Sequence, residues 1–199
     1  VANNIRLIDR FRGAPLIQSR MNAEPCRLRP DATRRSMMNY VEGFVAAVPA
    51  ANKEAYRKHA AAAAPLFKEY GVTRVVEAWG DDVPAGKVTD FKGAVKAKDD
   101  EVVVFSWWEY PDKATRDAAN KKMREDPRMK QMGADMPFDG KRLIYGGFTP
   151  IVEESTGGKM GYADGYLVAV PTANRQAYRD MAARAAAVFK EYGAVRVVE

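Results

Sequence analysis

Two adjacent carboxylates, Asp81 and Asp82, stand at the start of a long polar segment, GDDVPAGKVTDFKGAVKAKDD. Paired carboxyl groups can divide acid and base roles when their surroundings separate their pKa values, and they can also contact a hard cation. The alternative is that they close a turn through bonds from side chain to backbone. Because no His, Cys or further acidic residues cluster around them, we expect no metal here.

Two other residues could carry a proton. His59 is the only histidine, the residue type most suited to carry a proton at physiological pH, but its counterpart in the repeat described below is Met181, which favours a packing or tolerant surface position. Glu42 has the counterpart Asp164, so a carboxylate is kept within an apolar strand. Inside a barrel, burial would raise its pKa. A buried ion pair with an arginine explains the residue equally well.

Several residues could line a binding site. Ligand pockets are mostly apolar with a few polar groups, and the alternative for strand aromatics is the core or a dimer interface. The candidate pocket residues are Glu42, Trp79, Asp81, Asp82, Phe105, Trp107 and Trp108. The candidate polar or anion contacts are Arg116, Asn120, Arg128, Asp139 and Arg142. For the last three, arginine–aspartate pairs that fix the DPR and MPFDG turns are the alternative.

Residues 38–77 and 160–199 align without a gap, with 24 of 40 positions identical. Their offset of 122 residues far exceeds the roughly 20–50 residues of solenoid repeats, so it indicates a duplicated domain. We predict a complete domain at 38–154, a linker at 155–159, and a truncated second copy at 160–199. That copy would hold a first strand, a helix and the start of a second strand. Residues 1–37 would be an Arg-rich leader, disordered or upstream of a native start at Met37 or Met38.

The net charge of +6 and pI of about 9.4 suggest a nucleic-acid partner. Residues 1–36 supply +5 of that charge, however, so the repeated domain is nearly neutral and an RNA-associated protein is the least favoured hypothesis. No apolar run approaches the roughly 18 residues of a membrane helix. The single cysteine, Cys26, is compatible with a reducing cytoplasm, where we expect the protein.

The chain pattern predicts the elements that position these residues. An apolar run with both faces apolar precedes a helix that Asn52 caps and Gly71 ends. A short strand, the long connection, a strand rich in β-formers, a polar helix and a last strand follow, the last with Gly146 and Gly147 at a bulge. The expected ranges are strands 40–48, 73–79, 102–110 and 141–152, and helices 52–70 and 112–125.

The order βαββαβ is the ferredoxin-like topology, an α+β fold with an antiparallel sheet. Helices on one face leave the other face bare, and either set of alternate residues in 102–108 would make that face apolar. We therefore expect a second sheet to cover it, from a homodimer or from the second copy.

Four motifs give a family resemblance: GDDVPAGKVTDF (80–91), EVVVFSWWEYPDKATRDAAN (101–120), DPRM (126–129) and MPFDGKRLIYGGF (136–148). Residues 38–152 resemble the YbaA-like family of small bacterial proteins, the domain of unknown function numbered 1428. The resemblance implies a dimeric α+β barrel and brings no established activity, cofactor or catalytic residue.

The leading hypothesis is a cytoplasmic barrel domain that binds a small apolar or aromatic molecule between the sheet and the 80–100 segment. It could be an enzyme that needs no cofactor. The rival is a structural or regulatory dimer without enzymatic activity. An enclosed pocket that joins Trp107 or Trp108 to the carboxylates would favour the first, and a fully packed barrel the second.

Overall fold

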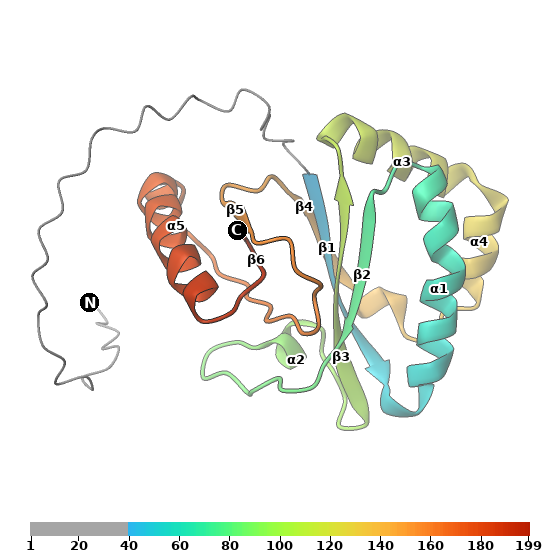
Figure 1. The fold of residues 1–199 in the computed structure, drawn as a ribbon. Helices are drawn as coiled ribbons and strands as arrows, with labels where there is room; N and C mark the ends of the chain where they lie inside the picture. Colours follow the sequence, from blue (N-terminus) through green and yellow to red (C-terminus); the bar gives the residue numbers. More distant parts are fainter. Residues whose placement is uncertain (1–39) are drawn as a thin grey trace, which may run out of the picture. The chain divides into compact units, whose positions relative to one another are not determined.

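A four-stranded antiparallel sheet forms the centre of the computed structural model, which describes residues 40–199. The strands are ordered β2-β3-β1-β4 (Figure 1). Their bounds are β1 (Tyr40–Pro49), β2 (Arg74–Trp79), β3 (Glu101–Tyr110) and β4 (Ile144–Phe148). This is the predicted α+β, ferredoxin-like arrangement, in which the two central strands are the apolar runs of the sequence.

Three helices cover one face of the sheet, called here the helix face (Figure 1). They are α1 (Lys53–Glu69), which follows a 3-10 turn η1 (Ala50–Asn52), α3 (Lys113–Glu125) and α4 (Pro127–Ala134). Gly71 ends the first helical segment with a φ of 102°, a left-handed conformation that favours glycine. Asp112 and Asp126 cap α3 and α4 by accepting from backbone N–H groups at 2.7 and 2.8 Å.

The helix face holds the largest buried side chains. Phe67 of α1 packs with Tyr40 and Tyr110 of the central strands at one end. Val48 and Val104 pack beside Tyr56 and Trp79 at the other. Burying a side chain of this size stabilises the fold by roughly 1.5–3 kcal/mol. This packing fixes α1 over the sheet and therefore determines what lies between α1 and β2.

The long connection after β2 covers part of the second face of the sheet. It contains the short helix α2 (Phe91–Ala94) and places Val95, which is 1% exposed, against Val45 and Val103. Phe91 meets Phe105 edge-on at 5.9 Å between ring centroids. Both faces of β1 are therefore covered, as its sequence predicted. Near Val45 the cover is this connection and not the expected second sheet.

Several local predictions were wrong. The strand expected over 141–152 is confined to β4, because residues 140–142 form a 3-10 turn, η2 (Gly140–Arg142). No bulge occurs at Gly146 and Gly147, since their pairing with β1 continues in register. Asn52 stands at the start of α1, but its side chain donates to the carbonyl of Pro137 at 2.8 Å and not to the helix. The helix α4 after Asp126 was not predicted.

In the second copy, the helix forms and the expected first strand does not. The copy contains η3 (Thr172–Asn174), α5 (Arg175–Glu191) and β6 (Arg196–Val198), and β6 pairs with β5 (Glu153–Ser155). Residues 160–171 carry no strand. Their counterpart β1 lies between β3 and β4, and residues 160–199 contain no counterpart of either neighbour. Tyr166, Leu167 and Val168 are therefore left exposed.

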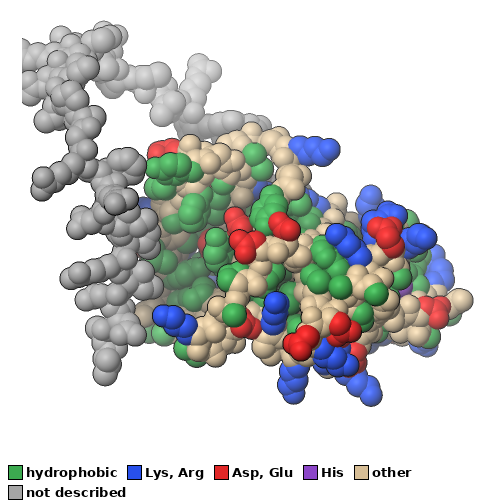
Figure 2. Space-filling view, turned by 90° about the horizontal axis from the view of Figure 1, so that it is seen from below, with side chains coloured by type: hydrophobic (Ala, Val, Ile, Leu, Met, Phe, Trp, Pro, Cys, Tyr) green, Lys and Arg blue, Asp and Glu red, His purple; other side chains and the backbone are tan. Residues whose placement is uncertain are grey.

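Figure 2 shows hydrophobic side chains gathered on one side of the face seen from below, with charged side chains mainly on the other. Many of the exposed large apolar residues belong to the second copy, including Val188, Phe189 and Tyr192 of α5 and its C-terminal turn. The leader (1–37) and Cys26 lie outside the described residues, so the expectations made for them stay predictions.

Candidate functional site

A buried carboxylate lies on the helix face near the start of β1. Glu42 of β1 is 2% exposed. Its Oε1 accepts a hydrogen bond from Asn120 Nδ2 at 3.2 Å and lies 3.6 Å from Arg116 Nε. Its Oε2 accepts from the hydroxyl of Tyr110 at 3.4 Å. Burial, and then the charge of Glu42, raise the pKa of Tyr110, so this phenol stays a hydrogen-bond donor.

Arg116 reaches this carboxylate because α3 crosses the end of β1. Its guanidinium lies 5.1 Å from the centre of the Tyr40 ring, and Nη2 donates to the Tyr40 hydroxyl at 3.3 Å. Directly across the sheet from Glu42 stands Gly147 of β4. A Cβ at Gly147 would overlap Arg116 Nη2 and the Tyr40 hydroxyl. The glycine therefore provides the space in which the arginine meets the carboxylate.

Two buried N–H groups near Glu42 have no hydrogen-bond partner in the described structure: Arg116 Nε and Trp108 Nε1. Trp108 is the cross-strand partner of Glu42 and lies on the same face. Leaving a buried donor unpaired costs about 1–3 kcal/mol, and such groups are rare in native proteins. The cluster of Glu42, Arg116, Asn120, Tyr110 and Tyr40, called here the Glu42 cluster, thus has donor capacity that the described side chains do not use.

Aromatic side chains adjoin the Glu42 cluster. Trp108 lies between Phe67 and Phe44, with ring centroids 4.0 and 4.5 Å away. Phe44 in turn stacks on Tyr145 of the edge strand β4 at 6.1 Å, and Tyr145 is 70% exposed. An apolar surface therefore runs from solvent at β4 toward the buried carboxylate.

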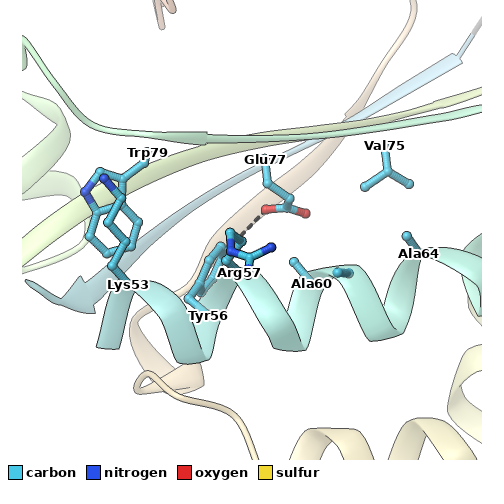
Figure 3. Close-up of a pocket in the computed structure, with 9 residues that line it drawn as sticks. Lys53, Tyr56, Arg57, Ala60, Ala64, Val75, Glu77 and Trp79 are labelled. Carbon is cyan, nitrogen blue, oxygen red and sulfur yellow. Dashed lines mark hydrogen bonds between the residues drawn. The ribbon is translucent and has the colours of Figure 1, made fainter. Parts of the chain in front are cut away.

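A concave feature lies between α1 and β2, called here the α1–β2 groove, and has a volume of about 410 Å³ (Figure 3). Residues of α1 and of the edge strand β2 line it: Lys53, Tyr56, Arg57, Ala60, Ala61, Ala64, Val75, Glu77 and Trp79. The Tyr56 hydroxyl donates to Glu77 Oε2 at 2.6 Å, and Ser106 donates to the same oxygen. Lys53 Nζ lies 5.4 Å from the centre of the Trp79 ring.

The second face of the sheet carries another buried carboxylate, Glu109, which is 6% exposed. Its Oε1 lies 3.3 Å from Arg74 Nη1 and accepts from the indole of Trp107 at 3.2 Å. Arg196 of the second copy donates to both carboxylate oxygens, at 2.6 and 3.2 Å. This carboxylate therefore links the sheet to the second copy.

The structure divides the candidate pocket residues between the two faces. Glu42, Trp79 and Trp108 lie on the helix face, whereas Phe105 and Trp107 lie on the second face. Asp81 and Asp82 are exposed, and Asp81 accepts from the hydroxyl of Tyr162 at 3.4 Å. These residues do not form one pocket. The Glu42 cluster does bring together Glu42, Arg116 and Asn120, which the sequence analysis proposed separately.

The remaining polar candidates form ion pairs at turns. Arg128 binds Asp126 at 2.8 Å and Glu69 at 3.0 Å. Arg142 contacts Asp139 at 3.1 Å and donates twice to Glu101 at 2.6 Å. These contacts agree with the structural alternative stated for the DPR and MPFDG turns.

A family model described as "Protein of unknown function (DUF1428)" matches residues 39–140 and 161–199. The chain belongs to the DUF1428 family. It is 67% identical over 117 residues to the uncharacterized protein YbaA of Escherichia coli K12, and the match covers 59% of this chain and all of that protein. YbaA of Shigella flexneri gives the same values. The resemblance found in the sequence is confirmed.

A solved structure described as a dimeric ferredoxin-like protein from an uncultured marine organism is also similar. It has a TM-score of 0.36 and 12% sequence identity, and the match covers 56% of this chain and 92% of that chain.

Sequence reasoning on this DUF1428 chain missed Tyr40, Tyr110, Glu77 and Glu109 as site residues. A signal for Glu77 was present, because Tyr56 and Glu77 recur as Tyr178 and Glu199 in the second copy. Tyr110 and Glu109 have no counterpart within residues 160–199, so the repeat could not mark them. Their roles follow from the pairing register of β1 with β3.

Within residues 40–199, no group of three or more His, Cys, Asp or Glu side chains is placed to hold a metal ion. In the same range, none of the helices has the length and apolar character needed to cross a membrane.

Proposed function

We propose that the first domain binds a small molecule at the Glu42 cluster, and that this molecule carries an acceptor oxygen on an aromatic or apolar body. The observation that carries the proposal is a pair of buried N–H groups that make no hydrogen bond beside a buried carboxylate: Trp108 Nε1, and Arg116 Nε, which lies 3.6 Å from Glu42 Oε1. An acceptor oxygen of the ligand would accept from Arg116 Nε or Trp108 Nε1. This would satisfy groups that are costly to leave unpaired.

The surroundings of the cluster support the same class of ligand. Phe44, Tyr145 and Trp108 offer an apolar wall beside the cluster. The contacts to Glu42 of 3.2–3.6 Å are long for charge-assisted bonds, which are near 2.7–2.9 Å for nitrogen donors. Contacts of this length leave room for the side chains to move closer together when a ligand binds.

Native mass spectrometry of the full chain and titration of its tryptophan fluorescence test the proposal. The probes are benzoate and benzamide, which both present an acceptor oxygen on an aromatic ring. We expect a saturable fluorescence change with at least one of them, lost in Arg116→Met and retained in the control Arg128→Met, whose arginine binds Asp126 and Glu69. A bare protein mass together with no saturable change for either probe would contradict the proposal.

The second candidate is a structural or regulatory domain that acts as a pair of copies. The ion pair between Arg196 and Glu109 favours this candidate, because it joins the second copy to the second face of the sheet in the first domain. Association of separate chains through that face would give a homodimer. Sedimentation velocity over a range of protein concentrations tests this, and a single monomeric species throughout would contradict association. We also propose a cytoplasmic location, based on the single cysteine.

A further inference from the structure

The residues that line the α1–β2 groove recur in the second copy of the repeat. Eight of its nine lining residues have counterparts 122 positions later: Arg175, Tyr178, Arg179, Ala182, Ala183, Ala186, Val197 and Glu199. Seven of these eight pairs are identical, and in the eighth Lys53 is replaced by Arg175. The central contact is also reproduced. The Tyr178 hydroxyl donates to Glu199 Oε2 at 2.6 Å, as the Tyr56 hydroxyl does to Glu77.

The copy of the groove between α5 and β6 is occupied. Val152 is 9% exposed and packs in one cluster with Ala182 and Ala186, with Tyr178 and Val197 against it. Val152 belongs to residues 151–155, which follow β4 and are called here the exit segment. Its backbone exchanges two hydrogen bonds with Glu199, at 3.0 and 3.3 Å. The exit segment therefore adds a strand to β6 and places an apolar side chain on the alanine stripe of α5.

The edge of β6 that receives the exit segment corresponds to the free edge of β2. Directly after β2, Gly80 N–H donates to the carbonyl of Val103 in β3 at 2.8 Å, so the β2 residues an even number of positions from Gly80 direct their amides toward β3. Glu77 is an odd number of positions from Gly80, so its amide points away from β3. Because β2 is the outermost strand of the described sheet, no strand of that sheet lies on this side. Its counterpart Glu199 uses that amide to bind Val152.

The charges around the groove are repeated as well. Glu154 of the exit segment accepts from Lys190 at 2.7 Å, and Glu153 accepts from Arg196 at 2.9 Å. The counterparts of these two cations in the first copy are Lys68 and Arg74. The first domain thus presents the same alanine stripe, the same tyrosine–glutamate pair and the same two cations beside a free strand edge.

We propose that the free edge of β2 with the α1–β2 groove is an acceptor site for the exit segment of a second copy of this chain. The segment would add to β2 as an antiparallel strand. Its valine would lie on Ala60 and Ala64, and its glutamates would face Lys68 and Arg74. This site is separate from the Glu42 cluster and does not depend on the ligand proposed there.

The exit segment is already bound to β6 of its own chain, and this intramolecular binding competes with binding to a second chain. Because the connection between the segment and β6 is short, β6 is present at an effective concentration on the order of mM. A peptide with the sequence of residues 149–156, TPIVEEST, provides the segment without that competition. The test is disulfide trapping on the full chain with Cys26→Ser and Ala64→Cys. The peptide carries the change Val152→Cys, with its thiol activated as a disulfide with 2-nitro-5-thiobenzoate, which leaves as the thiolate when the thiolate of the Ala64→Cys chain attacks. A scrambled peptide with the same activated cysteine is the control.

We expect the exit-segment peptide to form the mixed disulfide about tenfold faster than the scrambled peptide, because docking raises the local thiol concentration. A peptide with Glu153→Lys and Glu154→Lys should lose most of that advantage. Equal rates for the exit-segment and scrambled peptides would overturn the proposal. If Ala64→Cys does not fold, the ¹⁵N-labelled wild type decides: peptide-induced shifts at the Val75 and Glu77 amides support the site, and unchanged amides refute it.

Discussion

Arg196 binds Glu109 through both carboxylate oxygens, at 2.6 and 3.2 Å, and so joins the second copy to the sheet of the first. Arg74, which stands at the same position of the first copy, contacts Oε1 of the same carboxylate at 3.3 Å. The one carboxylate is therefore shared by the two arginines of the repeat. This relationship identifies the second face of the sheet as the place where the copies meet.

The first prediction concerns this link. Arg196→Met should reduce the free energy of unfolding of the second copy by about 1.5–3 kcal/mol, the usual contribution of a hydrogen bond to a charged group. Because Arg74 still holds Glu109, the first domain should remain folded. Hydrogen exchange followed by mass spectrometry should show faster exchange in α5 and β6, with no change in β1 and β3. Arg175→Met, at the exposed start of α5, is the control, and equal protection in both variants would contradict the prediction.

The second prediction tests the space left by Gly147. Gly147→Ala should displace Arg116 from Glu42, because the new Cβ would overlap Arg116 Nη2 and the Tyr40 hydroxyl. The loss in unfolding free energy should be about 2 kcal/mol, within the usual range for a substitution that breaks a buried polar network. Urea denaturation measures it.

Gly133→Ala is the matched control for Gly147→Ala. Gly133 lies in α4, and a Cβ there would meet no atom within 4 Å. Alanine at this helical position should be neutral or stabilising by up to about 1 kcal/mol. If both substitutions have the same effect on stability, the proposed role of Gly147 is wrong.

The third prediction concerns acid stability. The hydrogen bonds from Arg142 lower the pKa of Glu101 from 4.5 to about 2. A carboxylate with a lowered folded-state pKa stabilises the protein above its unfolded pKa, and this stabilisation is lost as the pH falls from about 4.5 to about 2. Arg142→Gln should therefore lower stability at neutral pH and flatten the dependence of stability on pH in this window. Urea midpoints across the window measure the effect, and Arg124→Gln, which removes an exposed arginine of α3, should keep the wild-type slope.

The fourth prediction addresses the hydroxyl in the α1–β2 groove. Tyr56→Phe should cost about 1.5–3 kcal/mol of unfolding free energy, because Glu77 loses a donor at 2.6 Å. Burial, and then the charge of Glu77, raise the pKa of Tyr56 above 10.0. This stabilisation is present below pH 10.0 and is lost as the pH rises toward the folded-state pKa, so the variant should be less sensitive to alkaline pH.

Tyr178→Phe removes the equivalent hydroxyl of the second copy. The hydrogen bond to Glu199 raises the pKa of Tyr178 to about 12, but Glu199 is exposed, so water can replace the lost donor. We expect a smaller loss of stability than for Tyr56→Phe. Thermal unfolding of the two variants side by side makes the comparison, and a larger loss for Tyr178→Phe would contradict it.

The sequence alone determined the family, the order of strands and helices, and the repeat. Those conclusions rest on signals in the sequence itself: the apolar runs of β1 and β3, the four family motifs, and Gly71, whose positive φ ends a helix. It also named Glu42, Arg116 and Asn120 as candidates. It could not bring them together, because Glu42 lies more than 70 residues from its partners in the chain.

The tertiary structure decided which candidates meet. Sheet register places Trp108 beside Glu42 and puts its neighbour Trp107 on the opposite face next to Glu109, since successive side chains of a strand point to opposite sides. The order of strands leaves β2 at an edge, and the packing of α1 against that edge creates the α1–β2 groove, whose counterpart between α5 and β6 is filled by Val152. A sequence motif states which side chains are present, whereas register, strand order and helix placement determine which of them share a surface.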